Sequence, residues 1–153
     1  MTIFIAIIVG LVILILGYFF VLGQMSKSGT APGLVEEKLT SCPASPNCIC
    51  SEYSNDQAHY VAPVDITGMP METVELKIKD AVQSLGGVLQ VERDGYLAYT
   101  FTSAIFRYVD DVEIRFDADN NALHLRSASR VGYSDLNANK QRIESIKRAF
   151  NNK

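Results

Sequence analysis

The sequence has no excess of basic residues, and this absence excludes one class of partner. Its 153 residues contain 14 Lys and Arg against 17 Asp and Glu, which gives a net charge of −3. Proteins that bind the phosphate backbone of nucleic acids generally carry a strong positive field. We therefore expect no nucleic-acid partner. A chain of this length has the usual size of one domain and leaves no room for a second core.

Charge is also missing from one long segment near the start of the chain. Residues 3–23 contain no charged side chain, and only Tyr18 has a polar tip. At about 1.5 Å of rise per residue, a helix of this length covers roughly 30 Å, the thickness of the hydrocarbon core of a bilayer. Residues 1–23 are therefore predicted to be a single transmembrane anchor, with residues 3–23 in the membrane.

The features of a cleaved signal are absent as well. A secretory signal has basic residues before a shorter apolar run and a small-residue cleavage site. Only Met1 and Thr2 precede the run, and no clear Ala-x-Ala site follows it, so Gly23 is the one alternative point of cleavage. No Cys lies near residue 20, and a lipid-modified cysteine is therefore not supported. We expect the anchor to be retained.

Two features of the sequence disagree on which side of the membrane the domain lies. Lys27 and Lys38 follow the anchor and no basic residue precedes it, and by the positive-inside rule this favours the cytoplasm. The cysteines Cys42 and Cys48 suit an oxidising compartment instead. We give more weight to the cysteines. The expected location is a bacterial inner (cell) membrane, with the domain on the periplasmic side.

Beyond the anchor the composition changes to Ser, Gly, Pro and charged residues. Gly29, Pro32 and Gly33 disfavour regular structure, so residues 24–41 are predicted to be a linker without helix or strand. Residues 42–153 are then the globular domain. Its first part, up to residue 51, contains two prolines and no periodicity, and is expected to be a loop.

Hydrophobic periodicity predicts the elements of the domain. We expect a short strand at residues 59–64, a helix that opens at Pro70 and stops at Gly86, and a last helix that begins after Ser134 or Asp135. Four further strands are expected between the helices, at residues 88–92, 96–102, 112–116 and 122–130. The apolar side chains predicted to pack the last helix are Leu136, Ile143, Ile146 and Phe150.

This order of elements indicates an α+β fold. We expect an antiparallel sheet of about four to five strands with two helices on one face, preceded by a single transmembrane helix. Along residues 111–116 apolar and charged side chains alternate, so the even positions are predicted to be buried and the odd positions to face water. The second face of the sheet is solvated, curled over a cavity or docked to another partner, and the sequence leaves all three open.

Three segments of the domain resemble successive motifs of one protein family. They read CPASPNC at residues 42–48, FRYVDDVE at 106–113 and RSASRVGYSD at 126–135. These motifs identify the chain as similar to the domain of unknown function 1499 (DUF1499) family over residues 42–149. The resemblance implies no established activity. Cys50, Asn137 and Lys140 depart from the residues that it leads us to expect, which are a non-cysteine, Gly and Arg.

The three cysteines allow several arrangements. Cys42 and Cys48 bracket a Pro-containing loop, and a disulfide between them would stabilise the fold by about 2 kcal/mol in the loop-entropy model. A zinc site would use these two with Cys50 and His59, although Cys-x-Cys is not the usual knuckle spacing. Free buried thiols are the third arrangement. We expect the disulfide and no metal, with Cys50 as an apolar filler or a reactive thiol.

One polar constellation has two interpretations. Arg126 and Arg130 precede a turn that leads directly into a helix, so guanidinium groups and free backbone N–H groups could hold a carboxylate or phosphate there. The other interpretation is cross-strand ion pairing with the acidic residues of the preceding strand. If Asp135 caps the helix, its carboxylate already fills the anion position. The candidate ligand-binding residues are Arg126, Ser129, Arg130, Tyr133, Asp110 and Asp111.

The sequence offers little support for catalysis. Asp110 and Asp111 are adjacent in a strand, so they point to opposite faces and cannot act as one acid/base pair. The serines lack a Gly-x-Ser-x-Gly elbow. We therefore name no catalytic residue and expect no cofactor. The alternative is a membrane-anchored, hydrolase-like enzyme that uses the surface of Asp110, Arg126 and Arg130.

The leading hypothesis is a non-catalytic binding or interaction module tethered to the membrane. Its ligand would be anionic or amphipathic, or it would bind a membrane partner, through the region of residues 126–135. Aromatic residues are frequent between residues 96 and 108. They leave open an apolar cavity for a small lipid-like ligand.

Overall fold

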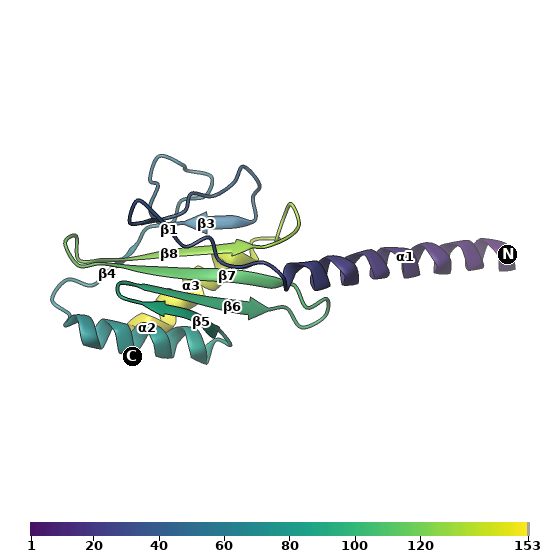
Figure 1. Ribbon diagram of the computed structural model, residues 1–153. Coiled ribbons are helices and arrows are strands. Elements are labelled where there is room, and N and C mark those ends of the chain that lie inside the picture. Colours follow the sequence, from purple (N-terminus) through teal and green to yellow (C-terminus); the bar gives the residue numbers. More distant parts are fainter. Residues whose placement is uncertain (153) are drawn as a thin grey trace.

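The computed structural model describes residues 1–152, in which a long helix projects from one end of a sheet (Figure 1). This helix, α1, spans Thr2–Ser26, and nearly all of its side chains up to residue 21 are exposed. It is long and apolar enough to cross a membrane. Only its last turns are buried against the rest of the chain, at Gly23 and Ser26.

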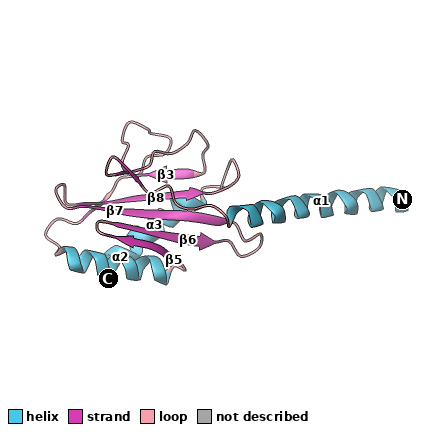
Figure 2. Cartoon of the chain, in the orientation of Figure 1, coloured by secondary structure: helices cyan, strands magenta, loops and turns pink. Residues whose placement is uncertain are grey.

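The main sheet is antiparallel throughout and has six strands (Figure 2). Its order is β3-β8-β7-β6-β5, and the short β4 also pairs with β8. A separate two-stranded hairpin, β1 and β2, lies before it in the chain. The bounds are Leu34–Val35 (β1), Lys38–Leu39 (β2), Cys48–Cys50 (β3), Val64–Asp65 (β4), Val88–Arg93 (β5), Tyr96–Thr102 (β6), Val109–Asp117 (β7) and Ala122–Ser129 (β8).

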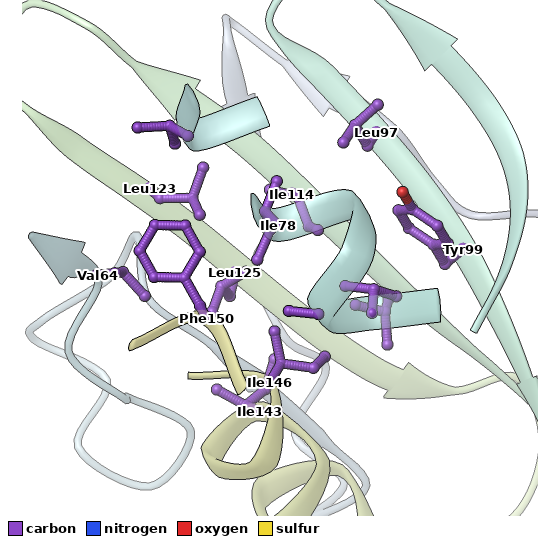
Figure 3. Close-up of a cluster of buried hydrophobic side chains, with 14 of the residues drawn as sticks. Val64, Ile78, Leu97, Tyr99, Ile114, Leu123, Leu125, Ile143, Ile146 and Phe150 are labelled. Carbon is purple, nitrogen blue, oxygen red and sulfur yellow. The ribbon is translucent and has the colours of Figure 1, made fainter. Parts of the chain in front are cut away.

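Two helices cover one face of this sheet, α2 at Met71–Ser84 and α3 at Ala138–Asn151. Figure 3 shows Ile78 of α2 and Phe150 of α3 directed at Leu125 and its neighbours on the sheet. Full burial of one such side chain contributes about 1.5–3 kcal/mol of hydrophobic stabilisation. The α+β class, the antiparallel sheet and the two helices on one face are therefore confirmed.

Over β7 and β8, the second face of the sheet is covered by the chain itself. A smaller cluster of buried side chains lies there and includes Leu39 of β2, Cys50 of β3 and Tyr96 of β6. The prediction that residues 24–41 hold no helix or strand is thus wrong, because α1 continues to Ser26 and β1–β2 follows. Its turn places Glu36 and Glu37 at φ 50° and 62°, a left-handed conformation that the usual Gly and Asn turn signals do not reveal.

The covered second face also corrects the prediction for the odd positions of β7. Asp111 and Glu113 are buried rather than solvated, at 4% and 0% exposure. Alternation of apolar and charged residues correctly separates the two faces of the strand. It does not reveal that the charged face meets other charged groups inside the protein.

The disulfide between Cys42 and Cys48 is confirmed, with 5.6 Å between the two Cα atoms. Because two of the proposed zinc ligands are joined to each other, the zinc alternative is wrong. Cys50 is the free cysteine and is buried. Burial raises the pKa of its thiol, so Cys50 acts as an apolar filler and not as a reactive thiolate.

Two element boundaries differ from prediction. Residues 59–64 form no continuous strand, because Tyr60 makes an isolated bridge to Cys50 and Pro63, which has no N–H, precedes the two residues of β4. The last helix begins at Ala138 rather than directly after Asp135, since Leu136 and Asn137 take φ 54° and 66°. Leu136 therefore lies outside the helix and is 88% exposed, not packed in the core.

Candidate functional site

A buried ion pair joins the two central strands on the second face of the sheet. Glu113 of β7 lies opposite Arg126 of β8, and its Oε2 is 2.7 Å from Arg126 Nη1. The other oxygen, Oε1, accepts hydrogen bonds from Tyr96 Oη at 2.8 Å and from the backbone N–H of Gly33 at 2.9 Å. Burial and the neighbouring Glu113 carboxylate raise the pKa of Tyr96, so its hydroxyl stays a donor.

A second pair lies at the end of the same strands, next to α1. Arg130 binds Asp111 through two parallel hydrogen bonds, Nε to Oδ2 at 2.8 Å and Nη2 to Oδ1 at 2.7 Å. Its remaining Nη1 donates to the carbonyl of Ser26 in the last turn of α1, at 3.2 Å. A cation at this end of a helix satisfies a free carbonyl and interacts favourably with the helix dipole. Arg130 thus connects the sheet to α1.

Other contacts hold the end of α1 against the β6–β7 loop. The Ser26 hydroxyl accepts a hydrogen bond from the backbone N–H of Val109 at 2.9 Å. The rings of Phe19 and Phe106 lie 5.4 Å apart between centroids. A Cβ atom added to Gly23 would overlap the carbonyl oxygen of Phe106, so only glycine permits this close approach.

The face that carries the helices has its own polar network. Asp110 of β7 pairs with Arg142 of α3, with Oδ2 and Nη2 2.7 Å apart. Arg142 also contacts Asn139, which is fully buried and donates to the Asn47 carbonyl at 2.8 Å. Asn47 in turn donates through its Nδ2 to the carbonyl of Gly132 at 2.7 Å. The disulfide loop therefore holds both the start of α3 and the loop before it.

A third charged cluster surrounds His124 near the opposite end of the sheet from α1. His124 Nδ1 lies 3.1 Å from Ser51 Oγ, and its Nε2 lies 3.7 Å from Asp117 Oδ2. Arg115 pairs with both Glu52 and Asp117, at 2.6 Å and 2.9 Å. Although this resembles a Ser-His-Asp arrangement, Ser51 is only 3% exposed and its hydroxyl already accepts from the backbone N–H of Leu125. The cluster is structural.

A cavity of about 470 Å³ lies where α1 meets the domain. We call it the α1 cleft. One wall is apolar and consists of Tyr18, Phe19 and Leu22 of α1 together with Phe106 and Tyr108. The other wall is mostly polar and comes from β7, β8 and the β8–α3 loop, with Asp110, Ser129, residues 131–135 and Ala138. The two walls together match a ligand with an apolar and a polar part.

The structure divides the six residues predicted to bind a ligand into two groups. Three of them, Asp110, Ser129 and Tyr133, line the α1 cleft. The other three, Asp111, Arg126 and Arg130, lie on the second face, where each is engaged in an ion pair. Ligand binding by these residues stays a prediction. The guanidinium groups of Arg126 and Arg130 were predicted to bind an external anion, but they bind carboxylates of the protein instead.

Two further expectations concern Asp135 and catalysis. Asp135 accepts hydrogen bonds from the backbone N–H groups of Asn137 and Asn139, so its carboxylate fills the anion position before α3. Asp110 and Arg130, which the enzyme alternative places on one surface, line separate cavities. Among residues 1–152, no three His, Cys, Asp or Glu side chains are grouped so that they could hold a metal ion.

Sequence reasoning missed the α1 side of the cleft. Tyr18, Phe19 and Leu22 belong to an apolar run that predicts contact with lipid only, and nothing in it marks a helix face that also meets the domain. Gly23 is the one signal that could have indicated this contact. A glycine directly after a long apolar helix permits close approach of another backbone.

The fold and these networks define an α+β domain carried on an apolar helix. A family model described as Protein of unknown function (DUF1499) matches residues 38–150. The chain belongs to this family, which confirms the resemblance of its three motifs. Comparison with curated proteins and with solved structures gives no match. The three motifs meet in space. Asn47 of the first motif bonds to Gly132 of the third, and the second and third motifs pair with each other along β7 and β8.

The Glu113–Arg126 pair yields a stability prediction. Glu113→Gln and Arg126→Met should each lower the free energy of unfolding by about 3–5 kcal/mol, because each leaves a buried group without its counter-charge. The double variant should lose less than the sum of the two. Urea unfolding of the detergent-solubilised chain measures this. Lys79→Met, which removes two partly exposed pairs with Glu75 and Glu92, is the control and should change little. Additive losses would contradict the pairing.

The His124 cluster yields a pH prediction. Burial lowers the pKa of His124 below its ordinary value of 6.5. As the pH falls through 6.5, the unfolded chain therefore binds a proton that the folded chain does not, and the free energy of unfolding decreases. Asp117 does not contribute in this range: burial raises its pKa, but hydrogen bonds from Asn120 and Arg115 outweigh this and hold it at about 2.

Unfolding measured from pH 8 to pH 5 should show this loss in the native chain and a smaller loss in His124→Asn. The stability difference between the two proteins should therefore shrink as the pH falls. Equal pH slopes in the two proteins would show that His124 is not held neutral by burial.

Proposed function

We propose that this protein is a membrane-tethered, non-catalytic binding module that takes an amphipathic ligand in the α1 cleft. The observation that carries the proposal is the composition of this cleft, in which an apolar wall from α1 faces a hydroxyl-rich and carboxylate-containing wall from the domain. Binding sites of this kind are concave and mostly apolar, with a few polar groups that orient the ligand.

The tether is α1. Its 25 residues are apolar and exposed over most of their length, and they project away from the sheet (Figure 1). Exposure of so many large apolar side chains to water is unfavourable, whereas the same surface is stable in hydrocarbon. The disulfide supports a domain on the periplasmic side of a bacterial inner membrane, because disulfides persist in oxidising compartments.

The charges of the cleft favour an amphipathic ligand over an anionic one. Within residues 1–152, no Lys or Arg lines it. Its two carboxylates are engaged, Asp110 with Arg142 and Asp135 with the N–H groups before α3. Hydroxyl groups of Ser103, Ser134 and Tyr133 complete the polar wall. A neutral or zwitterionic head group with hydrogen-bonding capacity fits these groups.

The enzyme alternative gains no support from the geometry. Its three residues do not form one surface, since Asp110 pairs with Arg142 of α3 on one face of the sheet, whereas Arg126 and Arg130 pair with acidic residues of β7 on the other. Each of the three is held in an ion pair within the protein. A binding module needs no activated nucleophile or base, and it accounts for the cleft without one.

Photo-crosslinking tests the proposal. The full chain in lipid nanodiscs is illuminated with a diazirine-labelled lysophosphatidylcholine, and peptides from residues 131–138 are examined by mass spectrometry. We expect adducts on these peptides. Ala138→Phe fills the cleft and should reduce the adducts severalfold, whereas Ala118→Phe, at an exposed position in a different cavity, should not. Unchanged labelling in Ala138→Phe would refute ligand binding in the cleft.

A further inference from the structure

Three large apolar side chains are among the most exposed in the domain, and all lie at its α1 end. They are Ile105 in the β6–β7 loop and Tyr133 and Leu136 in the β8–α3 loop, with 80%, 75% and 88% exposure. We call them the apolar loop tips. Both loops also line the α1 cleft, so the tips lie beside the last turns of α1.

We infer that the apolar loop tips lie in the head-group region of the bilayer that α1 spans, so that the domain contacts the membrane surface by a second site besides its tether. This inference rests on the tether of the proposed function, but it does not require a ligand in the α1 cleft. It assigns a lipid surface as the partner of this end of the domain.

The β6–β7 loop has a defined position along α1. The uncharged run comprises residues 3–23, and about 20 apolar residues are needed to cross the hydrocarbon core. Phe19 therefore lies at or within the boundary of the hydrocarbon region. Phe106 packs on the ring of Phe19, and its carbonyl lies against Gly23. The loop that carries Ile105 is thus held at the level of the lipid head groups.

Direct contacts hold α1 against the domain. Arg130 and Val109 bind the last turn of α1 directly, and glycine at position 23 allows backbone-to-backbone contact. These contacts hold the last turn of α1 against the ends of β7 and β8, so this end of the domain stays next to the end of the helix. Because the helix direction is fixed relative to the domain, the end of the domain that meets the bilayer is fixed as well.

The surface around α1 has the chemistry of a membrane interface. A continuous aromatic cluster runs there from Tyr18 through Phe19 and Phe106 to Tyr108, with successive ring centroids 5.7, 5.4 and 6.1 Å apart. Aromatic residues with polar tips are enriched where membrane proteins meet the head groups. Exposed Arg107 directly follows Ile105 and Phe106, and Lys27 directly follows α1, so cations lie where phosphate groups would be.

The backbone conformation at Leu136 also supports a contact with the membrane. Leu136 takes φ 54°, a left-handed conformation that is costly for a branched side chain, and this conformation leaves its side chain almost fully exposed. Neither the strain nor the exposure is offset by packing within the domain. Transfer of the side chain from water into the apolar edge of the head-group region offsets both.

Tryptophan fluorescence in proteoliposomes tests the inference, because the chain contains no Trp and each introduced one is the sole reporter. The probes are Ile105→Trp and Leu136→Trp. The matched control is Leu76→Trp on α2, a position that is 63% exposed. Phe20→Trp in α1 reports whether the tether itself lies in the bilayer. Phosphatidylcholine brominated on its acyl chains quenches reporters in lipid, and iodide quenches those in water.

Both loop reporters should show blue-shifted emission that brominated lipid quenches and iodide does not, whereas Leu76→Trp should show the reverse. If Phe20→Trp is quenched by brominated lipid but both loop reporters behave like Leu76→Trp, the inference fails and the tether stands. If Phe20→Trp is also unquenched, the tether and the inference fail together. Blue-shifted loop reporters without lipid quenching would identify a protein partner in place of the bilayer and would also overturn the inference.

Discussion

The ion pair between Asp111 and Arg130 is the interaction on which the arrangement of this protein depends. It joins the ends of β7 and β8, and the same guanidinium group binds the carbonyl group of Ser26, the last residue of α1. Because both side chains are largely buried, neither partner can be removed without leaving an uncompensated charge. The position of α1 determines one wall of the α1 cleft and the end of the domain that faces the bilayer. The proposed ligand site and the proposed membrane contact therefore both follow from this pair.

The charged face of the sheet explains how a short N-terminal segment becomes part of the fold. Residues 29–40 bury few apolar side chains, chiefly Leu39, so hydrophobic burial alone holds them weakly. The backbone N–H of Gly33 bonds to Glu113, and the side chain of Thr40 bonds back to the Gly33 carbonyl. Polar groups buried in this way are stable only when each has a partner, so they specify one position for the segment. The result is a domain with a different chemistry on each face of one sheet.

Much of this fold could be predicted from the sequence, because periodicity reports which side of an element is buried. The helix between Pro70 and Gly86, the strands at residues 88–92 and 96–102, the two faces of β7 and the disulfide all follow from local patterns. The coverage of the second face could not be predicted, since Glu36 and Glu37 form a turn that lacks its usual residues. The cleft was out of reach for a similar reason: Phe19 carries the signal of a lipid-facing residue, and its contact with Phe106 depends on tertiary structure.

The proposed ligand site and the proposed membrane contact both require α1 and the domain to form one rigid body. Distance measurement by pulsed electron paramagnetic resonance tests this directly, with spin labels on cysteines introduced at Ile15 in α1 and Leu76 in α2. Labelling is selective, because Cys42 and Cys48 are bridged and Cys50 is buried. In lipid nanodiscs, a rigid arrangement predicts a single narrow distance distribution centred on the separation in the structure. A broad distribution, as expected for a helix that moves on a flexible linker, would contradict it.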